Sequence, residues 1–294
     1  MMETQKSFEP KDKGSLYLVP TPIGNLEDMT FRAIRLLKEV DLIAAEDTRN
    51  TQKLLNHFDI TTPQISYHDH NVKERTEQLI QKLVDGQTIA QVSDAGMPSI
   101  SDPGVELVKA AIEAGISVIP LPGANAALTA LIASGLAPQP FYFYGFLPRK
   151  KNDLKEALND LNKREETLIF YESPHRLKQV IGEMRAIFGY DRQVVLAREV
   201  TKRFEEFIRG NLEEISEWTL SEQVRGEFVI IVEGNAHAED ESSPEWENWS
   251  VKEHVEHLME EKNVSSKEAI KEVAISRDLP KREIYSAYHQ LDEH

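Results

Sequence analysis

The feature that most constrains the fold of this chain is a loop of small residues directly after a short apolar run. Residues 88–92 (TIAQV) have the composition of a buried strand, and residues 93–104 continue as SDAGMPSISDPG. Such a loop leaves backbone amides open at the carboxyl end of a sheet, where open α/β folds bind ligands. Asp102 and Pro103 are typical of a helix N-cap and a first helical position, so we expect a helix from there toward Ala114. An ordinary strand-to-helix turn has the same pattern, and the binding interpretation gains weight only because further loops of this kind follow other strands.

The composition is that of a soluble globular protein without disulfides. The 294 residues include 40% hydrophobic and 29% charged residues and no cysteine, which excludes thiolate nucleophiles and thiolate metal ligands. No apolar stretch approaches the roughly 18 residues of a membrane helix, and residues 1–13 lack the apolar core of a signal peptide. We therefore expect a cytoplasmic protein, with a flexible segment at residues 1–13 and no metal site.

The net charge of −16 argues against indiscriminate binding of polyanions. The charge is uneven, because residues 237–294 hold 15 acidic and 7 basic residues, which is half of the excess. A local basic groove can still exist in the remainder of the chain.

Short apolar runs alternate with helical patterns in the first part of the chain, which predicts parallel strands joined by right-handed crossovers. The expected strands are residues 16–19, 41–45, 64–67, 88–92 and 116–119. They define an N-terminal α/β domain at residues 14–122. A second α/β domain is expected at residues 123–235. Its expected strands are residues 141–146, 167–171, 194–197 and 228–232, and an alanine-rich helix at residues 124–134, ended by Gly135, joins the two halves.

The end of the chain predicts a small helical domain at residues 246–294, after an acidic linker at residues 236–245. Its second helix opens with the capping box formed by Ser265 and Glu268. The third is expected to start at Pro280 and to carry one apolar face. That face comprises Ile284, Tyr285, Tyr288 and Leu291. The pattern suits a helix-turn-helix that contacts nucleic acid, and equally a bundle that binds a protein partner.

The loop after the first expected strand, residues 19–28, has one glycine and two prolines. The G-x-G-x-x-G pattern of dinucleotide sites is absent, as is a Walker A sequence, so a dinucleotide cofactor and nucleotide hydrolysis are disfavoured. Charged residues follow three other expected strands. They are Asp47 and Arg49, then Glu172, then Arg198, Glu199 and Lys202. Solvated or helix-capping residues would look similar, but strand ends are also where substrates meet an α/β sheet.

Taken together, these loops resemble one family. The strings LVPTPIGNLEDMT, AAEDTRNT, SDAGMPSISDPG, PGANAALTALIASGL, YESPHR and REVTKRFEE occur in this order between residues 18 and 206. They are similar to the ribosomal RNA small subunit methyltransferase I family, within the tetrapyrrole methylase superfamily. The resemblance covers about residues 14–235, and the tail after residue 246 is similar to that family's small C-terminal domain. The first loop lacks the glycine-rich pattern of superfamily members that methylate porphyrinoids, which puts a tetrapyrrole substrate in doubt.

The resemblance implies two α/β domains with S-adenosylmethionine between them, a homodimer, and methyl transfer to the ribose 2′-hydroxyl of a decoding-centre cytidine in 16S rRNA within the small ribosomal subunit. The cofactor-lining positions that it implies are Pro22, Ile23, Gly24, Asp94, Ala95, Pro98, Asn125, Ala126 and Tyr171.

Methyl transfer from a sulfonium is an in-line displacement, so positioning supplies much of the catalysis and a base assists the hydroxyl. The candidate bases are Asp47, Glu172 and Glu199, and the candidate orienting cations are Arg49, Arg198 and Lys202. The cations expected along the RNA path are Arg149, Lys150, Lys151, Arg198, Lys202, Arg203 and Arg209. Two other functions stay open, a methyltransferase for a porphyrin-like small molecule and a non-catalytic nucleic-acid-binding protein.

Overall fold

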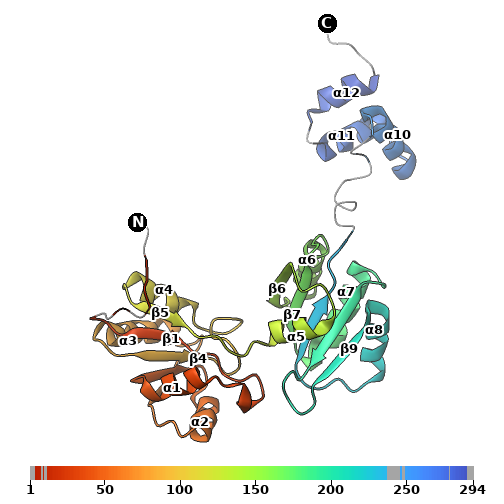
Figure 1. The fold of residues 1–294 in the computed structure, drawn as a ribbon. Helices are drawn as coiled ribbons and strands as arrows, with labels where there is room; N and C mark the ends of the chain where they lie inside the picture. Colours follow the sequence, from red (N-terminus) through yellow and green to blue (C-terminus); the bar gives the residue numbers. More distant parts are fainter. Residues whose placement is uncertain are drawn as a thin grey trace. The chain divides into compact units, whose positions relative to one another are not determined.

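The computed structural model describes residues 4–7, 9, 12–236, 246, 249–277 and 279–289. The chain divides into two compact units, Met1–Gly234 and Asn235–His294 (Figure 1), each of which is described by itself. Most of the expected acidic linker, residues 237–245, lies outside the described residues, as does Leu291. Residues 1–13, expected to be flexible, include Gln5, whose side-chain amide exchanges two hydrogen bonds with the backbone of Val118.

The first part of the larger unit is a five-stranded parallel sheet with the strand order β3–β2–β4–β1–β5 (Figure 1). Its strands are β1 (Ser15–Leu18), β2 (Leu42–Ala45), β3 (Gln64–Ser66), β4 (Ile89–Val92) and β5 (Ser117–Pro120). All five expected strands are present, and their parallel direction confirms the α/β prediction. All four residues of β4 are buried, as expected for a central strand covered by helices on both faces.

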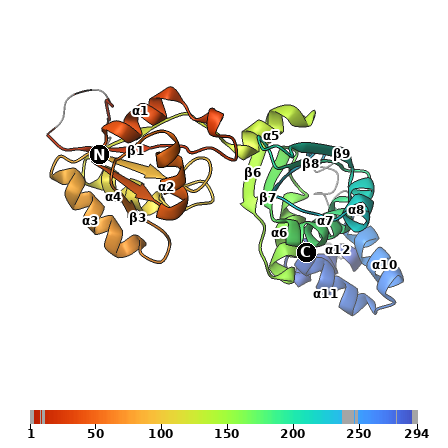
Figure 2. The same ribbon diagram turned by 90° about the horizontal axis from the view of Figure 1, so that it is seen from below.

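Helices cover both faces of this sheet, seen from below in Figure 2. After a short 3-10 turn at Leu26–Asp28, α1 (Phe31–Glu39) and α2 (Thr48–His57) pack on one face. On the other face lie α3 (Val72–Val84) and α4 (Val105–Glu113). The buried faces of these helices are leucine- and alanine-rich, so the two apolar layers hold the strands from either side.

The helix after β4 begins later than the sequence predicts. Asp102 does not cap it, because α4 starts at Val105 and the N-cap is Gly104. Gly104 has a φ of 148°, which favours glycine, and the carbonyl of Pro103 accepts a hydrogen bond from the buried Gln91 amide at 3.2 Å. These contacts keep Pro103 in the loop, so the Asp102 carboxylate is not used for capping.

The second part of the larger unit is a mixed sheet with the order β6–β7–β10–β8–β9. Its strands are β6 (Phe141–Phe146), β7 (Thr167–Glu172), β8 (Gln193–Arg198), β9 (Glu206–Asn211) and β10 (Phe228–Val232). Strands β6 and β7 are parallel, whereas β10 is antiparallel to both β7 and β8. The sequence analysis missed β9, an edge strand antiparallel to β8 whose residues are only partly buried or exposed.

Three helices pack on one face of the second sheet, and α5 (Ala126–Ser134) packs on the other. The three are α6 (Lys151–Leu161), α7 (Pro174–Phe188) and α8 (Leu212–Ser221), of which α8 was not expected. Gly135 ends α5 with a φ of 90°, as the sequence predicts, and α7 begins at Pro174 after the N-cap Ser173. Because α5 lies on the face opposite α6–α8, residues of β7, β8 and β10 form two separate apolar layers.

The smaller unit contains α10 (Val251–Lys262), α11 (Ser266–Ser276) and α12 (Lys281–His289) around one small core. The expected capping box of Ser265 and Glu268 is present. On α12, Ile284 is buried and Tyr288 packs against the core. Tyr285 is 48% exposed, so its assignment to the buried face was wrong.

Replacement of Leu158 by alanine should destabilise the larger unit. Leu158 on α6 is fully buried in the core between the second sheet and α6–α8, and Leu→Ala changes in such cores cost about 2–5 kcal/mol. Denaturant unfolding measures the loss in the free energy of unfolding. The control is Leu220→Ala on α8, where the side chain is 61% exposed and the expected change is below about 0.5 kcal/mol. Equal unfolding free energies for the two variants would contradict this packing.

Candidate functional site

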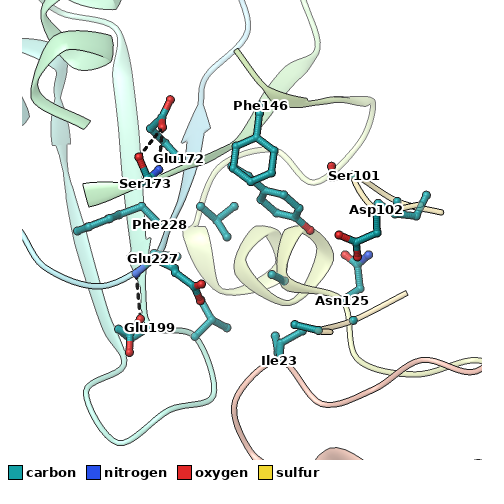
Figure 3. Close-up of a pocket in the computed structure, with 18 of the residues that line it drawn as sticks. Ile23, Ser101, Asp102, Asn125, Phe146, Glu172, Ser173, Glu199, Glu227 and Phe228 are labelled. Carbon is teal, nitrogen blue, oxygen red and sulfur yellow. Dashed lines mark hydrogen bonds between the residues drawn. The ribbon is translucent and has the colours of Figure 1, made fainter. Parts of the chain in front are cut away.

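A pocket of about 460 Å³ lies at the carboxyl ends of β1 and β4 and is completed by α5 and the second sheet. This volume is in the range of small-molecule sites. Its apolar wall includes Ile23, Ile100, Phe146, Val200 and Val229, and its charged residues are Asp102, Glu172, Glu199, Lys202 and Glu227. Figure 3 shows Asp102 beside Asn125 on one side of the pocket, with Glu199 and Glu227 on the other.

Two loops of the first sheet are tied together at the pocket. Strands β1 and β4 are neighbours, and beyond them Thr21 and Gly96 exchange two backbone hydrogen bonds of 2.9 and 3.0 Å. The Thr21 hydroxyl also donates to the carbonyl of Ser93 at 3.0 Å. The loop that carries Ile23 and the loop that carries Asp102 therefore form one surface, at the sheet edge where α/β folds bind ligands.

The β4 loop has an unusual backbone. Ser99 and Ser101 have φ values of 71° and 63°, although neither is glycine. A Cβ on Gly104 would lie 1.9 Å from the Gln91 amide nitrogen and 2.4 Å from the Ser99 hydroxyl. Such conformations cost free energy and persist only where the surrounding packing imposes them. The packing therefore fixes the direction of the segment between Ser99 and Gly104, which includes Asp102.

A second charged loop, after β8, contributes Lys202. Its ammonium group lies 3.0 Å from Glu199 and 2.7 Å from Glu227. Burial raises the pKa of Glu199, but the hydrogen bonds from the Glu227 amide and the Lys202 ammonium outweigh it and hold that pKa below its ordinary value. The side chain of Lys202 also lies against Gly24, where a Cβ would come within 2.3 Å of the Lys202 Cγ. Glycine at position 24 thus allows Lys202 to reach the first loop.

Glu172 and Arg176 hold the segment that follows β6. Glu172 is 3% exposed; one carboxylate oxygen accepts from the Ser173 amide at 2.7 Å, and the other lies 3.4 Å from Arg176. The Arg176 guanidinium donates to the carbonyls of Leu147 and Pro148. Phe146, just before them, is 56% exposed at the pocket. Glu172 thus lies beside the guanidinium that holds this segment, while its Oε2 oxygen makes no hydrogen bond within the described residues.

Asp47 and Arg49 lie outside this pocket. Arg49 forms a bidentate pair with Asp47, and its side chain is 87% exposed. Hydrogen bonds from Arg49 lower the pKa of Asp47 to about 2. Asp94 accepts hydrogen bonds from the Asp47 amide and the Asn50 side chain, which joins the loops after β2 and β4.

Of the predicted site residues, eight line the pocket. They are Ile23, Ala95, Asn125, Ala126, Tyr171, Glu172, Glu199 and Lys202. The others are not among its lining residues, namely Pro22, Gly24, Asp47, Arg49, Asp94, Pro98 and Arg198. Arg198 pairs with Glu206 at 3.1 Å.

The seven cations expected along an RNA path fall into two groups. Three are engaged within the fold: Arg209 donates to the carbonyls of Ala133 and Ser134 at the end of α5, Arg198 pairs with Glu206, and Lys202 pairs with Glu199 and Glu227. The other four, Arg149, Lys150, Lys151 and Arg203, are exposed.

Asp102 and Glu227 are the charged residues of this pocket that the sequence analysis did not identify as site residues. Burial, followed by the nearby negative charge of Glu46, raises the pKa of Asp102 to about 7, although the Ser93 hydroxyl opposes the shift. Because Asp102 and Pro103 have a helix-cap pattern, the sequence predicted that Asp102 caps a helix and not that it lines the pocket. The signal available in the sequence was the position of Asp102 within the loop after a buried strand.

The part of the chain that the structure describes contains no group of three or more His, Asp or Glu side chains arranged to hold a metal ion. Across the same ranges, no helix combines the length and the apolar composition needed to cross a membrane.

Comparison with known proteins shows the family. Residues 15–216 match the model of the Tetrapyrrole (Corrin/Porphyrin) Methylases. The chain belongs to the tetrapyrrole methylase family. It is a methyltransferase, and its resemblance to ribosomal RNA small subunit methyltransferase I extends over nearly its full length. A protein of that name from Bacillus subtilis is 57% identical over 98% of this chain and 99% of its own, and one from Synechocystis is 47% identical over 95% and 99%.

Solved structures of the tetrapyrrole methylase family share the fold. A cobalt precorrin-4 methyltransferase has a TM-score of 0.58 at 18% identity, covering 74% of this chain and 94% of its own. Uroporphyrin-III C-methyltransferase from Thermus thermophilus, in complex with S-adenosylhomocysteine, has a TM-score of 0.54 at 20% identity, covering 75% and 97%. At these identities the likeness shows the fold and not the substrate.

Asp102 should make the stability of this family member fall as pH rises. Its pKa is about 7 in the folded chain and 3.8 ordinarily, so between about pH 4 and pH 7 the folded state binds more protons than the unfolded state. The free energy of unfolding therefore decreases through this window.

Asp102→Asn removes this contribution, so its melting temperature should rise relative to that of the wild type between about pH 5 and pH 8. The control is Glu106→Gln on the exposed side of α4, which should follow the wild type at both pH values. A constant difference between wild type and Asp102→Asn would contradict the raised pKa.

Proposed function

We propose that this protein transfers a methyl group from S-adenosylmethionine to the ribose 2′-hydroxyl of a decoding-centre cytidine in 16S rRNA, with the small ribosomal subunit as its substrate. The observation that carries the proposal is the 57% identity, over 98% of the chain, to a protein named ribosomal RNA small subunit methyltransferase I. Identity at that level over both whole chains supports a common substrate, whereas the solved tetrapyrrole methyltransferases share only the fold.

The pocket suits S-adenosylmethionine in shape and charge. Ile23, Ile100 and Val229 offer apolar surface to an adenosine group, and the small residues of the β4 loop leave backbone close to the cavity. The charged lining contains four carboxylates and one lysine, which favours a ligand with positive charge. Bound there, S-adenosylmethionine would supply an electrophilic methyl group on a sulfonium. The tetrapyrrole methyltransferase with bound S-adenosylhomocysteine supports this choice of cofactor.

We assign the cofactor to the surface formed by the first loop, the β4 loop and the start of α5. Of the positions that the family resemblance implies, Ile23, Ala95, Asn125, Ala126 and Tyr171 line the pocket. Pro22, Gly24, Asp94 and Pro98 would act through the shape of the loops that carry them. Gly24 does so by admitting the Lys202 side chain.

The charged residues would divide between orientation and support. Lys202, held between Glu199 and Glu227, places an ammonium group at the pocket wall, where it can orient a ribose or a phosphate. Glu199 accepts a hydrogen bond from Lys202, which helps to lower its pKa and makes it a poor proton acceptor. Glu172 supports Phe146 through Arg176 and the backbone beyond it. Asp47, Arg49 and Arg198 would act at the surface outside the pocket.

Phe146 and the exposed cations provide groups that RNA recognition uses. An aromatic ring with 56% exposure at the mouth of a pocket can stack on an unpaired base. Arg203 is exposed on the loop that carries Lys202, and Arg149 follows the Phe146 segment. These positions would let phosphates be bound near the pocket despite the net charge of −16. A homodimer, which the family resemblance implies, is part of the proposal.

The decisive experiment is methyl transfer from labelled S-adenosylmethionine to small ribosomal subunits that lack the modification, followed by mapping of the labelled nucleotide. We expect label at one cytidine 2′-oxygen and none on uroporphyrin-III supplied as a competing acceptor. Calorimetry with S-adenosylhomocysteine is the binding control, and sedimentation gives the oligomeric state. Label on uroporphyrin-III, or none on the RNA while the cofactor binds, would overturn the proposal.

Binding of the small subunit should weaken with salt. Each phosphate neutralised contributes about 0.7 to 0.9 to the slope of log affinity against log salt. Arg203→Ala should lower this slope by about one phosphate contact, whereas Lys163→Ala should leave it unchanged, because Lys163 is exposed on another part of the unit and pairs with Asp160. Filter binding at several salt concentrations measures both slopes. An affinity independent of salt would remove the role given to the exposed cations.

A further inference from the structure

The negative charge at the end of the chain lies mainly outside the helices of the smaller unit. Residues 237–250 hold five acidic residues and no lysine or arginine, whereas residues 251–277 and 281–289 together hold seven acidic and seven basic residues. The helices α10–α12 therefore carry balanced charge. Whether they attract or repel a polyanion depends on how these charges are distributed over their faces.

One side of α12 gathers basic and aromatic side chains. The rotation of this helix, which packs with α10 and α11 (Figure 1), is fixed by two residues of the small core. Ile284 is buried there, and Tyr288 packs beside it with its hydroxyl 3.8 Å from the Met259 sulfur. Positions three, four and seven residues after 282 share another side of the helix with it. This exposed or partly exposed side, named here the α12 strip, consists of Arg282, Tyr285, Ser286 and His289.

The basic groups at the start of α12 are not neutralised within the described residues. Neither Lys281 nor Arg282 forms an ion pair there, whereas Lys262 on α10 lies 2.6 Å from Glu272. The acidic residue of α12, Glu283, lies about 100° around the helix from Arg282 and on the side away from the strip. The strip and the adjoining Lys281 therefore present positive charge to solvent.

Tyr285 supplies an aromatic surface beside these cations. Its side chain is 48% exposed, and its ring centroid lies 4.4 Å from that of His289. Exposed aromatic rings next to cations are the groups on which proteins stack unpaired bases while holding the phosphates. A protein partner would favour an apolar centre instead, and the strip contains no aliphatic side chain.

We propose that the α12 strip binds an unpaired RNA segment of the small ribosomal subunit, with Lys281 and Arg282 on phosphates and Tyr285 stacked on a base. The identity of this RNA rests on the proposed function. Helices α11 and α12 follow each other across a short turn, and in helix-turn-helix units the second helix is the one that contacts nucleic acid. Because the strip and the pocket belong to one chain, RNA held by the strip stays at high effective concentration near the pocket.

The first experiment measures binding of the full chain to small subunits and to protein-free 16S rRNA by filter binding at several salt concentrations. The double variant Lys281→Ala, Arg282→Ala should lower the slope of log affinity against log salt by about two phosphate contacts, each worth about 0.7 to 0.9. Lys252→Ala on α10 is the matched control, because its side chain is 53% exposed and lies 3.9 Å from Glu256. It should keep the wild-type slope.

The stacking contact has its own pair of variants. Tyr285→Ala should weaken binding of both RNA ligands about 5- to 100-fold, whereas Tyr285→Phe, which keeps the ring, should stay within about 2-fold of the wild type. Thermal unfolding followed by circular dichroism shows whether each variant is folded. Equal losses in the two folded variants would contradict stacking on the ring.

The kinetic readout separates binding by the strip from the chemistry of the pocket. In methyl transfer to small subunits, the double variant and Tyr285→Ala should raise KM for the subunit about as much as they raise Kd, because they remove binding that does not change as the methyl group moves. Affinity for S-adenosylhomocysteine, measured by calorimetry, reports on the pocket independently. A fall in kcat with KM unchanged would overturn the proposal.

The remaining outcomes distinguish the partners and the two proposals. Loss of affinity for small subunits but not for protein-free 16S rRNA would assign the strip to a protein of the subunit, and unchanged affinity for both would leave it without a role in binding. Either result overturns the inference. If the wild type binds 16S rRNA but methylates no subunit, the proposed function fails, while the binding data still decide whether the strip contacts RNA.

Discussion

The site depends on one connection, the pair of backbone hydrogen bonds between Thr21 and Gly96. Strands β1 and β4 are adjacent in the parallel sheet but 70 or more residues apart in the chain. Since parallel neighbours end at the same edge, the loops that follow them meet there. The two hydrogen bonds turn this proximity into a single surface, and Ile23 and Asp102 both reach the pocket from it.

Among the described residues, three of the four pocket carboxylates have a basic partner, and the fourth, Asp102, is available to a ligand. The ammonium group of Lys202 lies between two carboxylates, Glu199 and Glu227, and Arg176 lies beside the third, Glu172. These pairs also hold the loop after β8 and the segment after β6 in place. Asp102 keeps its charge unbalanced, at a cost in stability that rises with pH. An enzyme site commonly retains a destabilising group of this kind because its function requires it.

Within this family, proteins with the same fold are named for different substrates. The solved porphyrin and precorrin methyltransferases share the two sheets at about 20% identity, whereas the relatives at 57% and 47% identity are named for ribosomal RNA. The common framework supplies a cavity at a sheet edge. The features that suit RNA are exposed side chains at the rim of the cavity, such as Phe146 and Arg203. Such side chains can differ between family members while the fold stays the same.

The sequence by itself determined the alternation of strands and helices, because buried parallel strands need apolar runs and helices need an apolar stripe, and both patterns are local. It also determined most of the loops that form the site, through their small residues and their place after strands. It missed β9, whose edge position leaves a mixed polar pattern, and it assigned Asp102 to a helix cap. Only the tertiary structure decided which charged residues meet. Strand order and backbone packing connect residues far apart in the chain. They bring Lys202 within 2.7 Å of Glu227, place Asp47 outside the pocket, and leave Asp102 without an ion pair among the described residues.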